Sequence, residues 1–276
     1  MKALKYLIFP LIIFSVLVWI LANKEALHYE FFNGSILYSN AVFLKLLLTV
    51  ILPLLLINIT LGLKPKSGIY FGQMKNSFFI AVKSFSLVGP ACLSFVIIGF
   101  LGWSFTSWHG AITATVFFST ALVFIPKVTR KLSTRDEVEK KNLKIIYLLA
   151  TISTLTFIVL LVLTDLNPIL RNIFYFFFIV AVGEELLFRG YLQSSFNLFF
   201  GKYFKIYDVR FGWGLILSSI LFGIIHALVV SPIAWPWMLF TFIGGLILGF
   251  VREKDGSLLA PILLHFLMDF PLIFIT

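Results

Sequence analysis

The chain has 276 residues, of which 60% are hydrophobic and 12% are charged, and its formal net charge at pH 7 is +10. A soluble domain of this length cannot bury so large an apolar fraction, so the composition excludes an ordinary soluble protein and indicates a polytopic membrane protein. The positive charge is not arranged as a basic stripe with interleaved aromatic residues, which argues against nucleic acid as a partner and favours cytoplasmic loops beside anionic lipid.

A helix that crosses a bilayer needs about 20 mostly apolar residues. Segments of that kind recur along the whole chain with short polar breaks between them, and they lack the alternating pattern of a membrane β-barrel. We therefore predict an all-α polytopic integral membrane protein with eight or nine transmembrane helices, one of the segments being able to lie in the interface instead. The nine candidate segments are residues 6–21, 41–61, 77–101, 110–125, 145–164, 168–188, 213–230, 237–251 and 258–275.

Lysine and arginine gather in alternate breaks between these segments, and cytoplasmic loops are the ones that carry positive charge. The breaks predicted to be cytoplasmic are residues 2–5, 64–75, 127–144, 202–210 and 252–254, whereas residues 23–40, 102–109 and 231–236 are nearly free of positive charge. The high content of Phe, Ile and Lys is typical of an AT-rich, bacterial genome. We therefore expect a multi-pass protein of the cytoplasmic (inner) membrane with its basic loops inside.

The longest polar break divides the chain into three parts. Residues 1–126 are expected to form N-terminal transmembrane helices that act as a scaffold or guide a substrate. Residues 127–144, rich in both signs of charge, are expected to form a cytoplasmic linker. Residues 145–276 contain all the acids and histidines that lie at membrane depth, so the chemistry is predicted there.

Two adjacent acids, Glu184 and Glu185, lie inside the predicted span 168–188, where each charge costs roughly 2.5–3.5 kcal/mol. Residues four apart share a helix face, so Glu185 can pair with Arg189, while Glu184 is rotated from Glu185 by about 100°. This geometry predicts a structural role for Glu185 and leaves Glu184 to face a cavity between helices. The alternative is a helix end at the headgroups, where Arg189 and the acids reach water.

The same spacing places Phe222 on one face with His226, and His265 on one face with Asp269. A histidine bonded to a neighbouring carbonyl, or a pair that satisfies itself, would account for each feature alone. However, two of the four histidines lie at membrane depth, together with nearly every acid found there. Because ionisable groups inside a membrane gather where a proton or charge is handled, we predict an intramembrane active-site cavity in the C-terminal half.

Three motifs occur in order: Gly-Glu-Glu-Leu-Leu-Phe-Arg-Gly at residues 183–190, Phe-Gly-Ile-Ile-His at 222–226 and His-Phe-Leu-Met-Asp at 265–269. Together they resemble the motifs of the CPBP family, also called Abi, which comprises CAAX prenyl endopeptidases of type 2 and bacteriocin-processing intramembrane proteases. The resemblance covers about residues 145–276.

The resemblance implies hydrolysis of a peptide bond within the membrane by a water molecule. It assigns Glu184 as the general base, His226 as the residue that holds the water, and His265 with its i+4 partner as the oxyanion stabilisers. The last motif often ends in Asn in this family, whereas Asp269 stands here. An ionised Asp cannot donate a hydrogen bond, so we expect Asp269 to accept one from His265 and fix that ring, which leaves His265 as the donor.

Zinc is the rival to a metal-free mechanism, with Glu184, His226 and His265 as its ligands. No His-Glu-x-x-His motif is present, so no metal cofactor is favoured. The expected substrate is a membrane-embedded peptide or protein, such as a leader, a signalling peptide or a C-terminal tail. There are two alternatives: a non-proteolytic immunity or scaffold protein of the same fold, and a proton-coupled transporter. The spacing of Gly245 and Gly249 indicates close helix packing rather than the pore of a transporter. The oligomeric state is left open.

Overall fold

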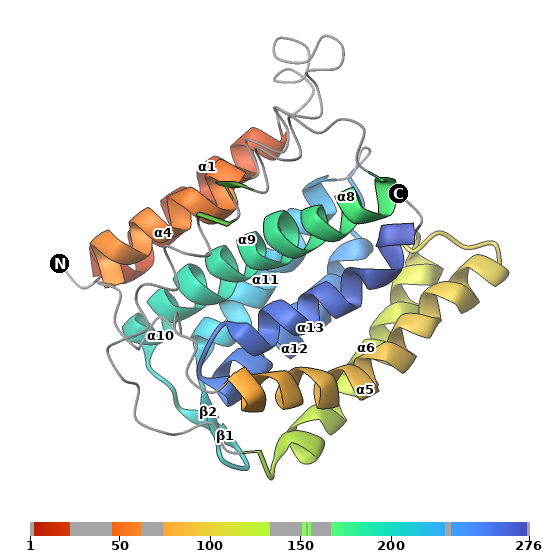
Figure 1. Ribbon diagram of the computed structural model, residues 1–276. Coiled ribbons are helices and arrows are strands. Elements are labelled where there is room, and N and C mark those ends of the chain that lie inside the picture. Colours follow the sequence, from red (N-terminus) through yellow and green to blue (C-terminus); the bar gives the residue numbers. More distant parts are fainter. Residues whose placement is uncertain are drawn as a thin grey trace, which may run out of the picture.

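The computed structural model describes residues 3–22, 46–61, 74–132, 151–152, 154–155, 167–229 and 233–274. Within these ranges, every regular element is helical except one short hairpin (Figure 1). The N-terminal elements, with η denoting π- or 3₁₀-helical stretches, are η1 (Leu4–Ile8), α1 (Phe9–Ala22), η2 (Leu47–Ile51), α4 (Leu52–Leu56), η3 (Ile57–Leu61), α5 (Met74–Phe100) and α6 (Trp108–Thr129). The predicted span 145–164 lies mostly outside the described residues.

The C-terminal elements begin with one unbroken helical run over residues 168–200. It consists of α8 (Pro168–Phe174), η6 (Tyr175–Ala181), α9 (Val182–Glu185), η7 (Leu186–Gln193) and α10 (Ser194–Phe200). The elements that follow it are β1 (Phe204–Ile206), β2 (Val209–Phe211), α11 (Trp213–Val229), α12 (Trp237–Asp255), α13 (Leu259–Asp269) and η8 (Phe270–Phe274).

The helical run 168–200 begins and ends at residues suited to those positions. The side chain of Asn167 accepts hydrogen bonds from the backbone N–H groups of Ile169 and Leu170, and Pro168 occupies the first helical position. At the other end Gly201 has φ +89°, a conformation that residues with a side chain rarely adopt. The helix is therefore longer than the predicted span, which ended at residue 188.

The helical run 168–200 is the central element of the bundle. It packs against the N-terminal elements on one side and against α11 to α13 on the other, while α5 and α6 cover the far side of α12 and α13 (Figure 1). All residues of η7 are buried, and Arg189 is 0% exposed. The interpretation of the Glu-Glu-x-x-x-Arg sequence as a helix end at the headgroups is therefore wrong.

Helices α11 and α12 approach closely because Gly245 has no side chain. A Cβ atom built at Gly245 would lie 3.0 Å from the Cβ and 3.1 Å from the Cα of Ser219 on α11. A Cβ atom at Gly249 would lie 3.0 Å from Oε1 of Gln193 and 3.1 Å from Cγ of Leu215. The close packing predicted from the spacing of these two glycines is confirmed.

The turn between α12 and α13 is fixed by one carboxylate. Asp255 accepts hydrogen bonds from the hydroxyl of Ser257, from the backbone N–H of Ala260 and from the hydroxyl of Ser77 on α5. Gly256, at φ +76°, ends α12 and lets the chain turn back. Helix α13 ends at Asp269, where the chain continues directly into the 3₁₀-helical stretch η8.

The hairpin is the one departure from the predicted all-α fold in the described residues. Strands β1 and β2 pair antiparallel, with Lys205 opposite Arg210. The hairpin contacts two helix ends at the same end of the bundle: Lys254 of α12 lies 2.7 Å from Oδ2 of Asp208, and Arg130 stacks 4.9 Å from the ring of Tyr207. Three of the breaks predicted to be cytoplasmic therefore meet here.

Two helices of the described part, Met74–Phe100 and Trp108–Thr129, are long and apolar enough to cross a membrane. Four shorter apolar helices accompany them: Leu4–Trp19, Leu47–Thr60, Trp213–Val229 and Leu259–Asp269. These helices agree with a membrane protein, whereas eight or nine crossings stay a prediction. Helix α6 continues to Thr129 with Pro126 inside it, and residues 133–144 lie outside the described part, so the linker 127–144 stays a prediction.

We expect Gly245→Ala to destabilise the protein by about 1–3 kcal/mol, because the added methyl group meets backbone of α11 and the two helices must separate. Gly244→Ala is the matched control, since its Cβ would meet only the flexible end of Met268 at 3.6 Å. Thermal unfolding in detergent should show a lower Tm for Gly245→Ala alone. Equal Tm values for the two variants would contradict the close contact.

Candidate active site

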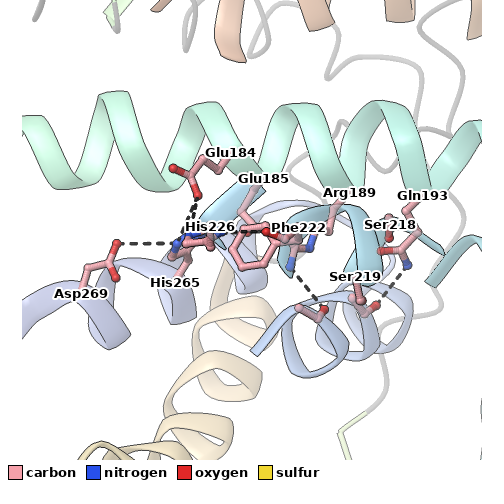
Figure 2. Close-up of polar contacts among 12 residues, drawn as sticks. Glu184, Glu185, Arg189, Gln193, Ser218, Ser219, Phe222, His226, His265 and Asp269 are labelled. Carbon is pink, nitrogen blue, oxygen red and sulfur yellow. Dashed lines mark hydrogen bonds and ion pairs between the residues drawn. The ribbon is translucent and has the colours of Figure 1, made fainter. Parts of the chain in front are cut away.

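The four residues predicted to be catalytic come together from three helices (Figure 2). Glu184 is on α9, His226 on α11, and His265 and Asp269 on α13. Oε2 of Glu184 lies 3.9 Å from Nε2 of His226 and 3.9 Å from Nε2 of His265. Both distances are too long for a direct hydrogen bond, but one water molecule can contact the carboxylate and a ring nitrogen together.

The tautomer of His226 follows from its neighbour on α11. Nδ1 of His226 lies 2.8 Å from the carbonyl oxygen of Phe222, one turn earlier in the helix. A carbonyl only accepts, so Nδ1 carries the proton, and in the neutral ring Nε2 presents a lone pair toward Glu184. His226 can therefore accept a hydrogen bond from a water molecule beside Glu184.

A second carboxylate lies deeper in the protein. Oε1 of Glu185 is 3.2 Å from NH1 of Arg189, so the predicted i,i+4 ion pair is confirmed. The NH2 group of Arg189 also donates to the carbonyl oxygen of Gly245 on α12 at 3.2 Å. The pair is fully enclosed, with side-chain exposures of 0% for Glu185 and 1% for Arg189.

Phe222 completes the surroundings of this ion pair. Its ring centroid lies 4.4 Å from the guanidinium carbon of Arg189, within the range of a cation–π contact. The same ring centroid lies 4.2 Å from that of His226 and 5.9 Å from that of His265. Phe222, predicted only as a supporting residue on the face of His226, thus contacts all three groups.

His265 connects the outer carboxylates with the buried one. Its Nδ1 lies 2.8 Å from Oε1 of Glu185, while its Nε2 lies 3.6 Å from Oδ2 of Asp269. The shortest contact of the ring is therefore to Glu185, and a role of Asp269 in orienting His265 stays a prediction. The expectation that Glu185 serves only to bind Arg189 is incomplete, because the same oxygen atom contacts the histidine.

Exposure separates these residues into two groups. The front group is Glu184, His226 and Asp269, whose side chains are 12%, 20% and 21% exposed. The back group is Glu185 and Arg189, which are closed off. His265 is 6% exposed and faces both groups, one ring nitrogen toward each. The front group is therefore partly exposed, whereas the back group is enclosed by protein.

The residues do not fit a metal ion as they are placed. Among the described residues, no group of three or more His, Cys, Asp or Glu side chains has an arrangement that could hold one. A tetrahedral zinc ion with bonds of about 2.1 Å brings its ligand atoms to about 3.4 Å from each other. The separations of 3.9 Å around Glu184 are longer than that.

One polar residue beside the site was missed in the sequence. Gln193 lies one turn beyond Arg189 and is 0% exposed, and its Nε2 donates to the carbonyl oxygen of Gly249 at 3.2 Å. The available signal was the spacing of four residues that continues from Glu185 through Arg189 to Gln193. It was overlooked because the predicted span ended at residue 188.

A carboxylate near two histidines and backed by a buried ion pair is an arrangement that can handle a proton or a charge. Residues 165–271 match the family model described as type II CAAX prenyl endopeptidase Rce1-like. All three motifs lie inside this matched region, and the match agrees with their resemblance to the CPBP family. No curated protein and no solved structure matched the chain.

We expect Arg189→Met to destabilise the protein by about 3–5 kcal/mol, because it leaves the carboxylate of Glu185 buried without its cation. The double variant Arg189→Met with Glu185→Gln removes the orphaned charge and should recover part of the loss. Thermal unfolding of both proteins in the same detergent measures the difference. A double variant less stable than Arg189→Met alone would contradict the pairing.

Proposed function

We propose that this protein is an intramembrane endopeptidase that hydrolyses a peptide bond of a membrane-associated peptide or protein with a water molecule activated by Glu184. The observation that carries the proposal is the position of Oε2 of Glu184, 3.9 Å from the Nε2 atoms of both His226 and His265. The family of residues 165–271 supports the reaction class.

In this mechanism the carboxylate of Glu184 and Nε2 of His226 both accept hydrogen bonds from one water molecule. Two acceptors use both hydrogens of the water, so a lone pair of its oxygen is directed away from them toward a substrate carbonyl. As the oxygen attacks the carbonyl carbon, Glu184 takes one proton, and the carbonyl electron pair moves onto the carbonyl oxygen. Glu184 then gives that proton to the amide nitrogen as the peptide bond breaks.

His265 is placed to stabilise the oxyanion. Because its Nδ1–H is directed to Glu185, Nε2 donates only when the ring carries both protons and a positive charge. The carboxylates of Glu184, Glu185 and Asp269 lie within 3.9 Å of the ring and supply the negative charge that a buried imidazolium needs. We propose that Asp269 holds this charge in place while Nε2–H donates to the oxyanion.

The substrate is proposed to be a peptide or protein segment that lies in the bilayer, such as a leader, a signalling peptide or a C-terminal tail. The protein is proposed to act in the cytoplasmic membrane with its basic breaks on the inside. The hairpin with Lys205 and Arg210, the preceding residue Lys202 and the end of α12 with Lys254 would then face the cytoplasm. Whether a prenyl group is required is decided by testing matched peptides with and without a farnesylated cysteine.

Glu184→Gln should abolish cleavage, lowering kcat by about 10³-fold or more, because an amide cannot take the proton from water. His226→Gln should lower kcat by about 10²–10⁴-fold. His109→Gln is the matched control, since His109 lies on α6 with its ring against Trp103. The assay is mass spectrometry of a panel of membrane peptides incubated with purified protein in liposomes.

Equal cleavage by the wild type and Glu184→Gln would overturn the assignment of the base. If none of the peptides were cleaved by the wild type, while a membrane peptide bound tightly to it, the result would favour the non-proteolytic scaffold over the endopeptidase.

Activity should survive exhaustive chelation, because the proposed steps use only side chains and water. Purified protein is dialysed against a strong chelator, its metal content is measured, and cleavage is compared with that of the untreated sample. Loss of activity together with recovery on addition of zinc would contradict the metal-free mechanism.

A further inference from the structure

The helical run 168–200 and α12 face each other through polar contacts that repeat every turn. Arg189 donates to the carbonyl oxygen of Gly245, and Gln193 donates to that of Gly249, each at 3.2 Å. One turn further, Nδ2 of Asn197 donates to Oε1 of Glu253 at 2.7 Å. Each of the three pairs joins residues 56 positions apart. The two helices therefore run parallel and in one fixed register along this face.

Glu253 is the acceptor in the last of these three pairs, and it accepts more hydrogen bonds than the acceptors of the other two pairs. Its Oε1 also accepts from Nε2 of Gln193 at 2.7 Å and from NH1 of Arg252 at 3.0 Å, while Oε2 pairs with Nζ of Lys202. The side chain of Glu253 is 1% exposed and that of Lys202 is 37% exposed. A buried carboxylate thus binds side chains from both helices at the end of the bundle where the hairpin lies.

Glu253 lies beyond the predicted span 237–251. Its surroundings favour the ionised carboxylate. Burial alone would raise the pKa of its carboxyl, but the charges of Arg252 and Lys202 and the hydrogen bonds from Lys202 and Gln193 outweigh it, so the pKa lies below its usual range. Hydrogen bonds to a charged acceptor are roughly twice as strong as neutral ones. The negative charge is therefore what makes this contact stronger than the amide–carbonyl contacts before it.

A second path leads from Glu253 back to the arginine of the site. Arg252, which pairs with Glu253, donates from NH2 to the hydroxyl of Ser194 at 2.8 Å. The hydroxyl of Ser194 donates in turn to the carbonyl oxygen of Arg189 at 3.1 Å. Both the side chain and the backbone of Arg189 are thereby tied to α12.

We propose that Glu253 is a positioning residue for the active site, which sets the register of the helical run 168–200 against α12. Through Gln193 and Ser194 it holds Arg189, Arg189 holds Glu185, and Glu185 holds Nδ1 of His265. The geometry of the site then depends on the negative charge of Glu253, which lies more than three helical turns away from Glu184. Glu253 itself contacts neither the substrate nor the attacking water. The effect on cleavage rests on the proposed function, whereas the effect on His265 does not.

Glu253→Gln keeps the shape of the side chain and removes its charge. We expect kcat to fall about tenfold with KM unchanged, because the contacts that lead from Glu253 to His265 do not include the substrate. The second readout is independent of activity: ¹⁵N NMR of histidine-labelled protein follows the titration of His265, identified among the four histidines by substitution. A looser contact to Glu185 should move the midpoint of that titration by a measurable fraction of a pH unit.

Asp208→Asn is the matched control, because it removes an ion pair with Lys254, the residue that follows Glu253 on α12. It should leave kcat within about twofold and the His265 titration unchanged, even if both variants lower the Tm equally. An unchanged His265 titration in Glu253→Gln, or an equal change in Asp208→Asn, would overturn the proposal. If the wild type cleaves nothing, the proposed function fails, and the His265 titration alone still decides the positioning role.

Discussion

The buried ion pair between Glu185 and Arg189 is the interaction on which the rest of the structure depends. Two charges that are taken out of water cost several kcal/mol each unless geometry and further hydrogen bonds compensate them. Here the same carboxylate oxygen contacts both Arg189 and His265, and Arg189 is further held by the carbonyl of Gly245 and the ring of Phe222. Four helical segments must therefore meet at one place before the charges are tolerated.

This requirement positions the residues that we propose to be catalytic. Helix α13 is attached to the ion pair through Nδ1 of His265, which leaves Nε2 of the same ring directed to Glu184 and Asp269. Helix α11 is attached through Phe222, whose carbonyl fixes the tautomer of His226. The front group of residues can thus keep some access to water while the groups behind it hold their orientation.

Much of the site could be predicted from the sequence because it uses helical spacing. Glu185 with Arg189 and Phe222 with His226 are contacts within one helix, and both were expected. The contact between His265 and Glu185 joins residues 80 positions apart, so no local pattern could show it, and Asp269 was assigned the role instead. The end of the helix was missed for a similar reason: Arg189 and Gln193 look like the start of a polar loop until their partners on α12 are known.

The fold was also predicted in part. The positions of α1, α5, α6, α11 and α12 followed from apolar length, whereas the hairpin was not expected, because its strands are only three residues each and lie in a break read from its charge. The alternation of basic breaks indicated which helix ends belong together, and three of those breaks do meet at one end. Charge patterning thus carried topological information that apolar length alone did not.

The proposed mechanism requires a water molecule between the carboxylate of Glu184 and the histidines. An experimental structure in lipid nanodiscs, at a resolution that shows ordered water, tests this requirement most directly. We predict a water molecule about 2.7–3.2 Å from both Oε2 of Glu184 and Nε2 of His226, with Nδ1 of His265 on Glu185. A metal ion bound by His226 and His265, or a Glu184 side chain turned away from both rings, would contradict it.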